Sequence, residues 1–226
     1  MSACADADLP LVILGAGGHA KVVHAIAVLT GRTLLGVCDP LLAAQGVTQW
    51  RGVPVLGGDA ALAQLNAQQV GLVNGIGQLP GKSLREQLYL TQRQAGFRFP
   101  ALVHPSAWVD VSVRLADGVQ VMAGAMVQPD CVIGRNTVIN TGASVDHDCI
   151  VGEHVHIAPG VTLCGNVVVD AGAFVGAGAT VLPGVRIGAG ALVGAGTCLR
   201  RPLTAHATHM GHNRPSIHTL NTAPHD

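Results

Sequence analysis

The chain has 226 residues, a length that suits two modest domains. Basic and acidic residues number thirteen each, charged residues make up only 12% of the chain and no basic run occurs, so an electrostatic nucleic-acid-binding surface is not expected. No apolar run reaches the ~18–20 residues that a membrane span needs, and the N-terminus carries Asp6 and Asp8 without a basic region, so we expect neither a membrane span nor a secretory signal.

Residues 11–39 predict a β-α-β unit that binds a nucleotide. A buried strand over residues 11–14 runs into the glycine-rich turn GAGGH, a helix follows over residues 20–29, and a second strand over residues 34–38 ends at Asp39. The helix is expected to turn four apolar side chains toward the sheet: Val22, Val23, Ile26 and Leu29. Glycines let a backbone approach phosphates at a helix N-terminus, while a carboxylate accepts hydrogen bonds from a ribose or a base.

The glycine turn lacks the third glycine of the GxGxxG pattern, so a turn that only packs the helix on the strand is the alternative to a ligand site. Further along, residues 60–65 and 83–95 are typical of helices, and residues 72–74 of a strand that ends in a glycine turn. We therefore expect an α/β Rossmann-like domain over residues 1–100, with a sheet of three or four parallel strands. Only a short linker follows, so this domain should pack rigidly on the next one.

The second half of the chain repeats every six residues. From Val103 to Leu199 every sixth residue is aliphatic, which gives seventeen successive matches without an insertion. The fourth hexad position is glycine in nine of sixteen hexads, and the third is proline in four of them: Pro105, Pro129, Pro159 and Pro183. These residues favour a turn after each short strand. Three strands per coil close a triangular prism, so residues eighteen positions apart stack at the same corner.

The prism predicts an all-β domain over residues 101–201, followed by a tail over residues 202–226. Each coil buries its apolar face only against its neighbours, and this burial does not offset the cost of ordering the backbone, so we expect an oligomer. The six cysteines have neither CxxC nor zinc spacing, which predicts reduced cysteines and a cytoplasmic protein, with Cys131 and Cys149 stacked in the core. Five of the eleven histidines fall in the tail, where we expect solvated or docked side chains rather than a metal site.

His147 is the residue that the repeat does not explain. It occupies a third position, where four hexads carry proline, and its side chain should point away from the prism at a corner. Imidazole is a suitable general base near neutral pH. Gly165 follows eighteen residues later, so its N–H should stack beside the imidazole, and a base next to a backbone donor suits acyl transfer. Asp148 is explained equally well as a turn residue and as a catalytic partner.

His156 follows His147 by nine residues and should lie on the flat face opposite the His147 corner. The two histidines then belong to one site only if different subunits supply them, and a trimer with three sites between subunits is the hypothesis that follows. His154 sits at a position of positive φ, which histidine tolerates, and we interpret it as structural. A carbonic anhydrase of the hexapeptide type would instead bring His147, His154 and His156 together on zinc, but the N-terminal domain would then lack a purpose.

These features resemble a known family over nearly the whole chain. The segments GAGGHAKVV and VDHDCIVGEHVHIAPGVTLCGNV, Asp39 and the turn at Gly75 to Gly77 are similar to bacterial nucleotide-sugar acetyltransferases. That family includes the UDP-bacillosamine and GDP-perosamine N-acetyltransferases and the related sialic acid O-acetyltransferases. The resemblance implies a left-handed parallel β-helix for the prism, with acetyl transfer from acetyl-CoA to a nucleotide-activated amino sugar by a homotrimer that uses no metal.

The resemblance also implies roles for individual residues. It makes His147 the general base, Asp148 the acid that raises its basicity, and Gly165 the oxyanion donor. The contacts with acetyl-CoA correspond to His156, Gly165, Ala177 and Ala195. The contacts with the nucleotide sugar correspond to Gly17, Gly18, His19, Asp39, Pro40 and Gly77.

Three departures from the family pattern stand out. Asp148 is shorter than the glutamate that is common there, so it is expected to meet the imidazole differently; Gln78 stands where asparagine is frequent; and the tail lacks the usual closing segment. Arg200 and Arg201 lie near the end of the repeat. They either pair with the 3′-phosphate of the coenzyme or belong to the solvated surface. Two other functions stay open. One is O-acetylation of a sugar hydroxyl, and the other is a non-catalytic module that binds a nucleotide sugar.

Overall fold

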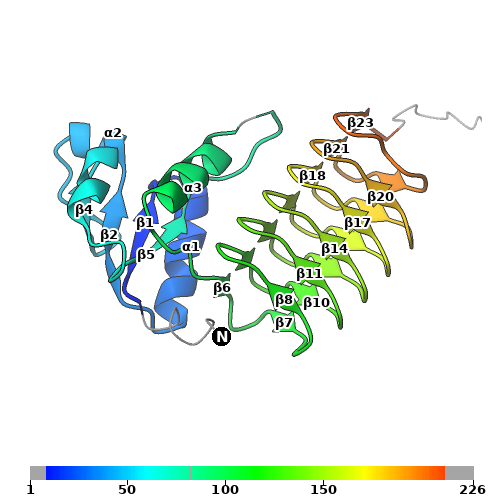
Figure 1. The fold of residues 1–226 in the computed structure, drawn as a ribbon, viewed down its shortest axis with the longest axis horizontal. Helices are drawn as coiled ribbons and strands as arrows, with labels where there is room; N and C mark the ends of the chain where they lie inside the picture. Colours follow the sequence, from blue (N-terminus) through cyan, green and yellow to red (C-terminus); the bar gives the residue numbers. More distant parts are fainter. Residues whose placement is uncertain (1–8, 82, 212–226) are drawn as a thin grey trace, which may run out of the picture.

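The computed structural model describes residues 9–81 and 83–211, which form an α/β unit followed by a three-sided parallel β-helix (Figure 1). The predicted sequence of an α/β unit and a β-solenoid is therefore confirmed. Asp6 and Asp8, and the tail histidines His212, His218 and His225, lie outside the described residues. Within the described ranges, no helix is both long enough and apolar enough to cross a membrane.

The α/β unit is built on a five-stranded sheet with strand order β3-β4-β2-β1-β5. The strands are β1 (Leu11–Leu14), β2 (Leu34–Cys38), β3 (Gln49–Trp50), β4 (Val53–Gly57) and β5 (Gly71–Asn74). The helices are α1 (Gly18–Leu29), α2 (Pro40–Ala44), the 3-10 helix η1 (Asp59–Gln64) and α3 (Leu84–Gln94). Four strands run parallel, as predicted, and the edge strand β3 pairs antiparallel with β4.

The sequence interpretation missed the helix α2 and the hairpin of β3 and β4. Asp39 caps α2, because its Oδ1 accepts hydrogen bonds from the backbone N–H groups of Leu41 and Leu42, and Pro40 fills the first helical position. An acid followed by proline is a recognised helix start. A helix of five residues, however, is too short to produce an apolar periodicity, which explains why the pattern did not reveal it.

The buried stripe of α1 also differs from the prediction. Val23 and Ile26 are fully buried, as expected, whereas Val22 and Leu29 are 41% and 61% exposed. The helix buries Ala20, Val23 and Ala27, which are spaced by three and four residues and so lie on one face. Val22 and Leu29 fall outside that face, because adjacent residues on a helix point about 100° apart.

The β-helix has three flat sheets, in which each strand pairs in parallel with the strand one coil further on. The first sheet holds β6 (Leu102–Val103), β9 (Gln120–Val121), β12 (Val138–Ile139), β15 (His156–Ile157), β18 (Phe174–Val175), β21 (Leu192–Val193) and β23 (Thr208–His209). The second sheet holds β7 (Trp108–Val109), β10 (Met126–Val127), β13 (Ser144–Val145), β16 (Thr162–Leu163), β19 (Thr180–Val181) and β22 (Cys198–Leu199). The third sheet holds β8 (Arg114–Leu115), β11 (Val132–Ile133), β14 (Ile150–Val151), β17 (Val168–Val169) and β20 (Arg186–Ile187).

The hexad repeat explains how the β-helix is stabilised. The aliphatic first positions form one continuous buried column, in which Val121, Ile139 and Ile157 are fully inaccessible to solvent. The fourth positions adopt positive φ, as at Gly142 with φ of 65°, and the non-glycine residues there include Asp148. Most of the fifth positions are small and buried, as at Ala143 and Ala179, so that the corners close. Packing between coils thus depends on the six-residue rhythm at every step.

The parallel coil continues beyond the predicted end of the domain at residue 201. Strand β23 pairs with β21, with Thr208 beside Leu192, and Leu203 forms a bridge with Ile187. Thr208 follows Leu192 by sixteen residues rather than eighteen, since 208 − 192 is 16. The last coil is therefore two residues short, which is why a strict six-residue pattern did not detect it.

The α/β unit lies against the first sheet, next to the first coils of the β-helix (Figure 1). Leu102, Met122 and Val138 of the β-helix share an apolar cluster with Ile13 and Val23 of the α/β unit. Helix α1 also contacts strand β6. This shared core supports the predicted rigid packing and leaves the other two sheets uncovered by the α/β unit.

Candidate active site

His147 and Asp148 form a hydrogen-bonded pair at one corner of the β-helix. His147 Nδ1 lies 2.7 Å from Asp148 Oδ2, and both side chains are about half exposed. Because a carboxylate only accepts, Nδ1 carries the hydrogen and Nε2 is left as the free acceptor. The hydrogen bond to Asp148 raises the pKa of His147 above its ordinary value, with smaller contributions from the charges of Asp146 and Asp148. The shorter Asp148 therefore does reach the imidazole.

Gly165 lies directly beside this imidazole, one coil further on. A Cβ atom added to Gly165 would lie 2.7 Å from both Cε1 and Nε2 of His147. Glycine is therefore needed at this position for the imidazole to keep its place, although Gly165 does not have positive φ. The Gly165 N–H has no acceptor among the described residues. A base atom and an unpaired backbone donor thus stand side by side, as the eighteen-residue spacing predicted.

The backbone amides of Ala177 and Ala195 are also without an acceptor among the described residues, because both residues occupy a corner position of the hexad. Both residues occupy third positions of the hexad, where four hexads carry proline, and proline has no N–H to contribute. Neither amide donates to an acceptor in the described ranges, whereas their carbonyls lie in the corner ladder, as in the bond from Gly196 N–H to Ala177 O. Ala177 and Ala195 stack on the corner between the first and second sheets. Two outward-facing donors therefore line that edge.

His156 lies on the first sheet and is nearly buried, with 6% of its surface exposed. Its ring stacks on Phe174 with centroids 4.9 Å apart, and Nδ1 is buried without a partner in the described part of the chain. Burial, assisted by the charge of Arg85, lowers the pKa of His156 to about 3. His156 is therefore neutral at physiological pH.

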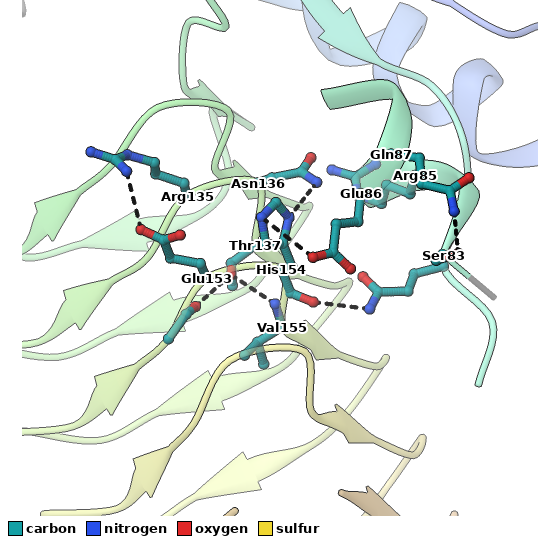
Figure 2. A network of polar contacts seen from close by, with 12 residues as sticks. Ser83, Arg85, Glu86, Gln87, Arg135, Asn136, Thr137, Glu153, His154 and Val155 are labelled. Atoms are coloured by element: carbon teal, nitrogen blue, oxygen red, sulfur yellow. Dashed lines mark hydrogen bonds and ion pairs between the residues drawn. The ribbon is translucent and has the colours of Figure 1, made fainter. Parts of the chain in front are cut away.

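His154 lies at the remaining corner and joins the α/β unit to the β-helix. Figure 2 shows its ring between Asn136 and Glu86. The Asn136 amide lies 3.0 Å from Nδ1, and Gln78 Nε2 donates to the His154 carbonyl at 2.9 Å. With φ of 57°, His154 holds a turn, as predicted, and its burial lowers its pKa.

The three histidines proposed for a zinc site do not meet within the chain. His147 lies at the corner between the second and third sheets, His156 on the first sheet, and His154 at the corner between the third and first sheets. Among the described residues, no three His, Cys, Asp or Glu side chains gather closely enough to hold a metal ion. The turn at His154 and its contacts with Asn136 and Gln78 explain this histidine as a structural residue.

The glycine-rich turn opens onto a cavity of about 440 Å³ at the carboxyl ends of β1 and β5. The cavity is lined by Ala16, Gly17, Gly18, His19, Asp39, Gly75, Ile76, Gly77, Gln78 and Leu79. Five of the six predicted nucleotide contacts line it, whereas Pro40 starts α2 outside the lining.

Gly17 and Gly18 have no packing reason to be glycine. No heavy atom lies within 4 Å of a Cβ added to either one, whereas a Cβ on Gly15 would lie 2.5 Å from Ile76. The N-terminus of α1 has no side-chain cap and no acidic residue in its first turn. An open, uncapped helix N-terminus with space in front of it suits an anionic group.

Asp39 ties the glycine turn to the next helix. Its Oδ2 accepts a hydrogen bond from Ala16 N–H at 2.8 Å, while Oδ1 caps α2. The carboxylate therefore shapes the cavity wall, and Oδ2 keeps a second lone pair for a ligand.

Two buried residues near the cavity were not recognised in the sequence. Gln120 of β9 bonds His19 and the carbonyl of Asn74, and Arg85 of α3 donates from Nη1 to the carbonyls of Asn74 and Ile76. Gln120 and Arg85 are 1% and 2% exposed. One signal for Gln120 was present. Gln120 is polar, whereas most of the outward positions that stack with it in the same sheet are apolar: Leu102, Val138, Phe174 and Leu192.

The candidate groups fall on two sides of one chain. The cavity, His156 and the amides of Ala177 and Ala195 lie on or beside the first sheet, whose first coils pack against the α/β unit. His147 and Gly165 lie at the opposite corner, between the second and third sheets. Within one chain, the base therefore faces away from the cavity.

Two protein families match the chain and together cover most of it. The PglD N-terminal domain family matches residues 10–89. The bacterial transferase hexapeptide family (six repeats) matches residues 112–147, 132–165 and 166–201. No curated protein sequence matches the chain.

Several solved structures are similar over nearly their whole length. A mutant of perosamine N-acetyltransferase from Caulobacter crescentus, in complex with CoA and GDP-perosamine, is 42% identical and superimposes with a TM-score of 0.81, covering 89% of this chain and 93% of that one. The acetyltransferase domain of PglB from Neisseria gonorrhoeae FA1090, in complex with acetyl coenzyme A, is 31% identical, with a TM-score of 0.82 and coverage of 90% and 97%. WeeI from Acinetobacter baumannii AYE shares the fold at 23% identity, with a TM-score of 0.80 and coverage of 91% and 98%.

Proposed function

Because the chain belongs to the hexapeptide-repeat nucleotide-sugar acetyltransferases, with their α/β N-terminal domain and left-handed parallel β-helix, we propose that it acetylates the amine of a nucleotide-linked amino sugar. Acetyl-CoA is the acetyl donor, as the complexes of the similar proteins with CoA and acetyl coenzyme A suggest. The observation that carries the proposal is the contact of the His147 imidazole with Gly165 at a corner of the β-helix.

In the proposed reaction, the sugar amine attacks the thioester carbonyl carbon directly. His147 Nε2 takes the proton that the amine loses, and the Gly165 N–H donates to the oxygen as it becomes negative. Collapse of the tetrahedral intermediate breaks the carbon–sulfur bond, and the imidazolium returns its proton to the departing thiolate. Asp148 holds the imidazole with Nδ1–H toward itself and so keeps Nε2 as the base.

The two substrates have separate places on the chain. The nucleotide fits the cavity at Gly17 and Gly18, where the N-terminus of α1 is open to its phosphates. The free amides of Ala177 and Ala195, together with His156, are the groups we propose for the coenzyme. Arg200 and Arg201 line a separate cavity of about 310 Å³ near the last coil, which is a second place to seek the coenzyme's phosphate.

We further propose that the site is shared between subunits of a homotrimer. The base and the cavity lie on opposite sides of one chain, so a complete site needs the His147 corner of one subunit against the first sheet of another. The outward residues of the third sheet include Val132, Ile150 and Val168, of which Ile150 is 51% exposed. Such apolar side chains beside the His147 corner suit a subunit contact.

One assay separates this function from its rivals. Purified protein should release thiol from acetyl-CoA with at least one member of a panel of UDP-, GDP- and dTDP-linked amino sugars, with metal content measured on the same sample. Activity only with hydroxyl acceptors would favour O-acetylation. Binding of a nucleotide sugar without thiol release would favour the non-catalytic module.

Replacing Asp148 with asparagine should move the acid limb of the pH profile for kcat/KM to lower pH. Asp148 raises the pKa of His147, and a base whose pKa is raised is lost at higher pH as the solution is acidified. Without the carboxylate the imidazole stays neutral to lower pH, but it is a weaker base, so the plateau rate should also fall. Steady-state rates across the pH range measure both effects, and an unmoved limb would remove Asp148 from the mechanism.

A further inference from the structure

The wall of the nucleotide cavity contains a hydrogen-bonded chain that crosses from one unit of the protein to the other. His19, at the start of α1, lines the cavity, and its Nε2 lies 2.7 Å from Oε1 of Gln120 on strand β9. The Gln120 Nε2 donates to the carbonyl oxygen of Asn74 at 2.9 Å. A β-helix residue therefore holds a ring that faces the α/β cavity.

The partners in this chain fix which nitrogen of His19 carries hydrogen. A backbone carbonyl can only accept, so the amide nitrogen of Gln120 must face Asn74 and its oxygen must face His19. An amide oxygen also only accepts, so His19 Nε2 must be the donor. If the ring is neutral, Nδ1 is then a bare acceptor.

The surroundings of His19 keep the ring neutral. Burial lowers the pKa of His19 to about 4, and the positive charge of Arg85 acts in the same direction. The other titratable groups around it are His156, which is also neutral, and Asp39 on the cavity wall. The hydrogen bond that His19 donates to Gln120 raises the pKa of His19, but this effect is outweighed.

We infer that Gln120 is a positioning residue that fixes His19 as the Nε2–H tautomer, so that Nδ1 accepts a hydrogen bond from a hydroxyl or N–H group of the bound nucleotide sugar. The ligand half of this inference rests on the proposed function. His19 Nδ1 has no donor among the described residues; a Cβ added to the neighbouring Gly18 would meet no atom within 4 Å, and one added to Gly77 would lie 3.6 Å from His19 Cβ. A neutral acceptor repels a phosphate oxygen, so the phosphates belong at the N-terminus of α1 and a donor group of the ligand belongs at His19.

The tautomer can be measured without any substrate. In protein with nitrogen-15-labelled histidine, the His19 resonances, assigned by comparison with His19→Asn, should show a protonated Nε2 and an unprotonated Nδ1 from neutral pH down to about pH 5. In Gln120→Met, which keeps the length of the side chain but not the amide, the Nε2–H tautomer should lose its dominance. Val138→Ala is the matched control, because Val138 pairs with Gln120 in the same sheet and is equally buried but lacks a hydrogen bond to His19.

The functional effect of losing the Gln120 amide should appear in the KM for the nucleotide sugar and not in the KM for acetyl-CoA. Gln120→Met should raise KM for the nucleotide sugar about tenfold, the usual effect of one lost hydrogen bond, with KM for acetyl-CoA within about twofold of the wild type. Val138→Ala should lower thermal stability through lost packing and leave both KM values and the tautomer unchanged.

Two results would overturn the inference. One is a wild-type His19 with its hydrogen on Nδ1, a result that does not depend on any variant folding. The other is a Gln120→Met protein with the wild-type tautomer and an unchanged KM for the nucleotide sugar. A wild-type protein that binds no nucleotide sugar would contradict the proposed function and the ligand half of the inference, while the resonances would still decide the role of Gln120 in setting the tautomer.

Discussion

Replacing His147 with alanine should lower kcat by about 10²–10⁴-fold, the usual contribution of a general base. The reason is that no other described residue offers a basic nitrogen beside Gly165, whereas the cavity and the free amides for the coenzyme lie elsewhere and remain intact. KM values for both substrates should therefore change little. Thiol release at saturating substrates measures the effect, and unfolding by heat should confirm an intact fold, because the His147 side chain is half exposed.

The matched variant at the same corner is Gly165→Ala. Its Cβ would lie 2.7 Å from His147 Nε2, so the ring must move away from the amide that it stands beside. A loss of about 10²-fold in kcat is expected, since misplaced catalytic groups and impaired oxyanion donors each cost on that order. The control Gly142→Ala alters a glycine at a different corner from His147, where an added Cβ meets no atom within 4 Å, and it should reduce stability, because its φ is 65°, without this loss of kcat. Wild-type kcat in His147→Ala would contradict the assigned base.

Two inactive variants should restore activity to each other when they share a trimer. His147→Ala removes the base, and Gly17→Glu places a carboxylate in the cavity, where no atom lies within 4 Å of the added Cβ and the phosphates are expected. If each site takes its base from one subunit and its cavity from another, every trimer that holds both kinds of chain has one wild-type site among its three, or about one third of the sites.

The measurement is thiol release by protein from co-expressed, differently tagged chains purified through both tags. About one third of the wild-type rate per site is expected, because each doubly tagged trimer has one wild-type site among its three, compared with a near-zero rate for each variant alone. Chains carrying both substitutions, mixed with wild type, provide the control for the statistics of mixing. A doubly tagged trimer without restored activity would show that base and cavity belong to the same chain, and a purely monomeric protein with full activity would exclude a shared site.

Much of the site was predictable because a solenoid turns sequence spacing into geometry. Residues eighteen positions apart must stack, so the contact between His147 and Gly165 followed from counting, as did the separation of His156 from His147. The apolar first positions predicted the core for the same reason. The handedness of the coil came from the family resemblance, because spacing alone does not distinguish the two hands.

What was missed depends on contacts that periodicity does not encode. The caps and short strands around Asp39 and β3 are too brief to show a pattern, and the last coil escaped because it is two residues short. The roles of Gln120 and Arg85 depend on how the α/β unit docks on the first sheet. The geometry of Asp148 also lies outside the periodicity: at a turn position with φ of 59°, its short carboxylate reaches Nδ1 of His147.

The most direct test of the central claim is the structure of the reaction product formed from acetyl-CoA labelled with carbon-13 in the acetyl group. With the amino sugar that the panel identifies, magnetic resonance should show the label as an amide on the sugar nitrogen of the nucleotide sugar, with one thiol released per amide formed. Label that stays on the coenzyme with every amino sugar, or that appears as an ester on a sugar hydroxyl, would contradict the proposed N-acetyl transfer.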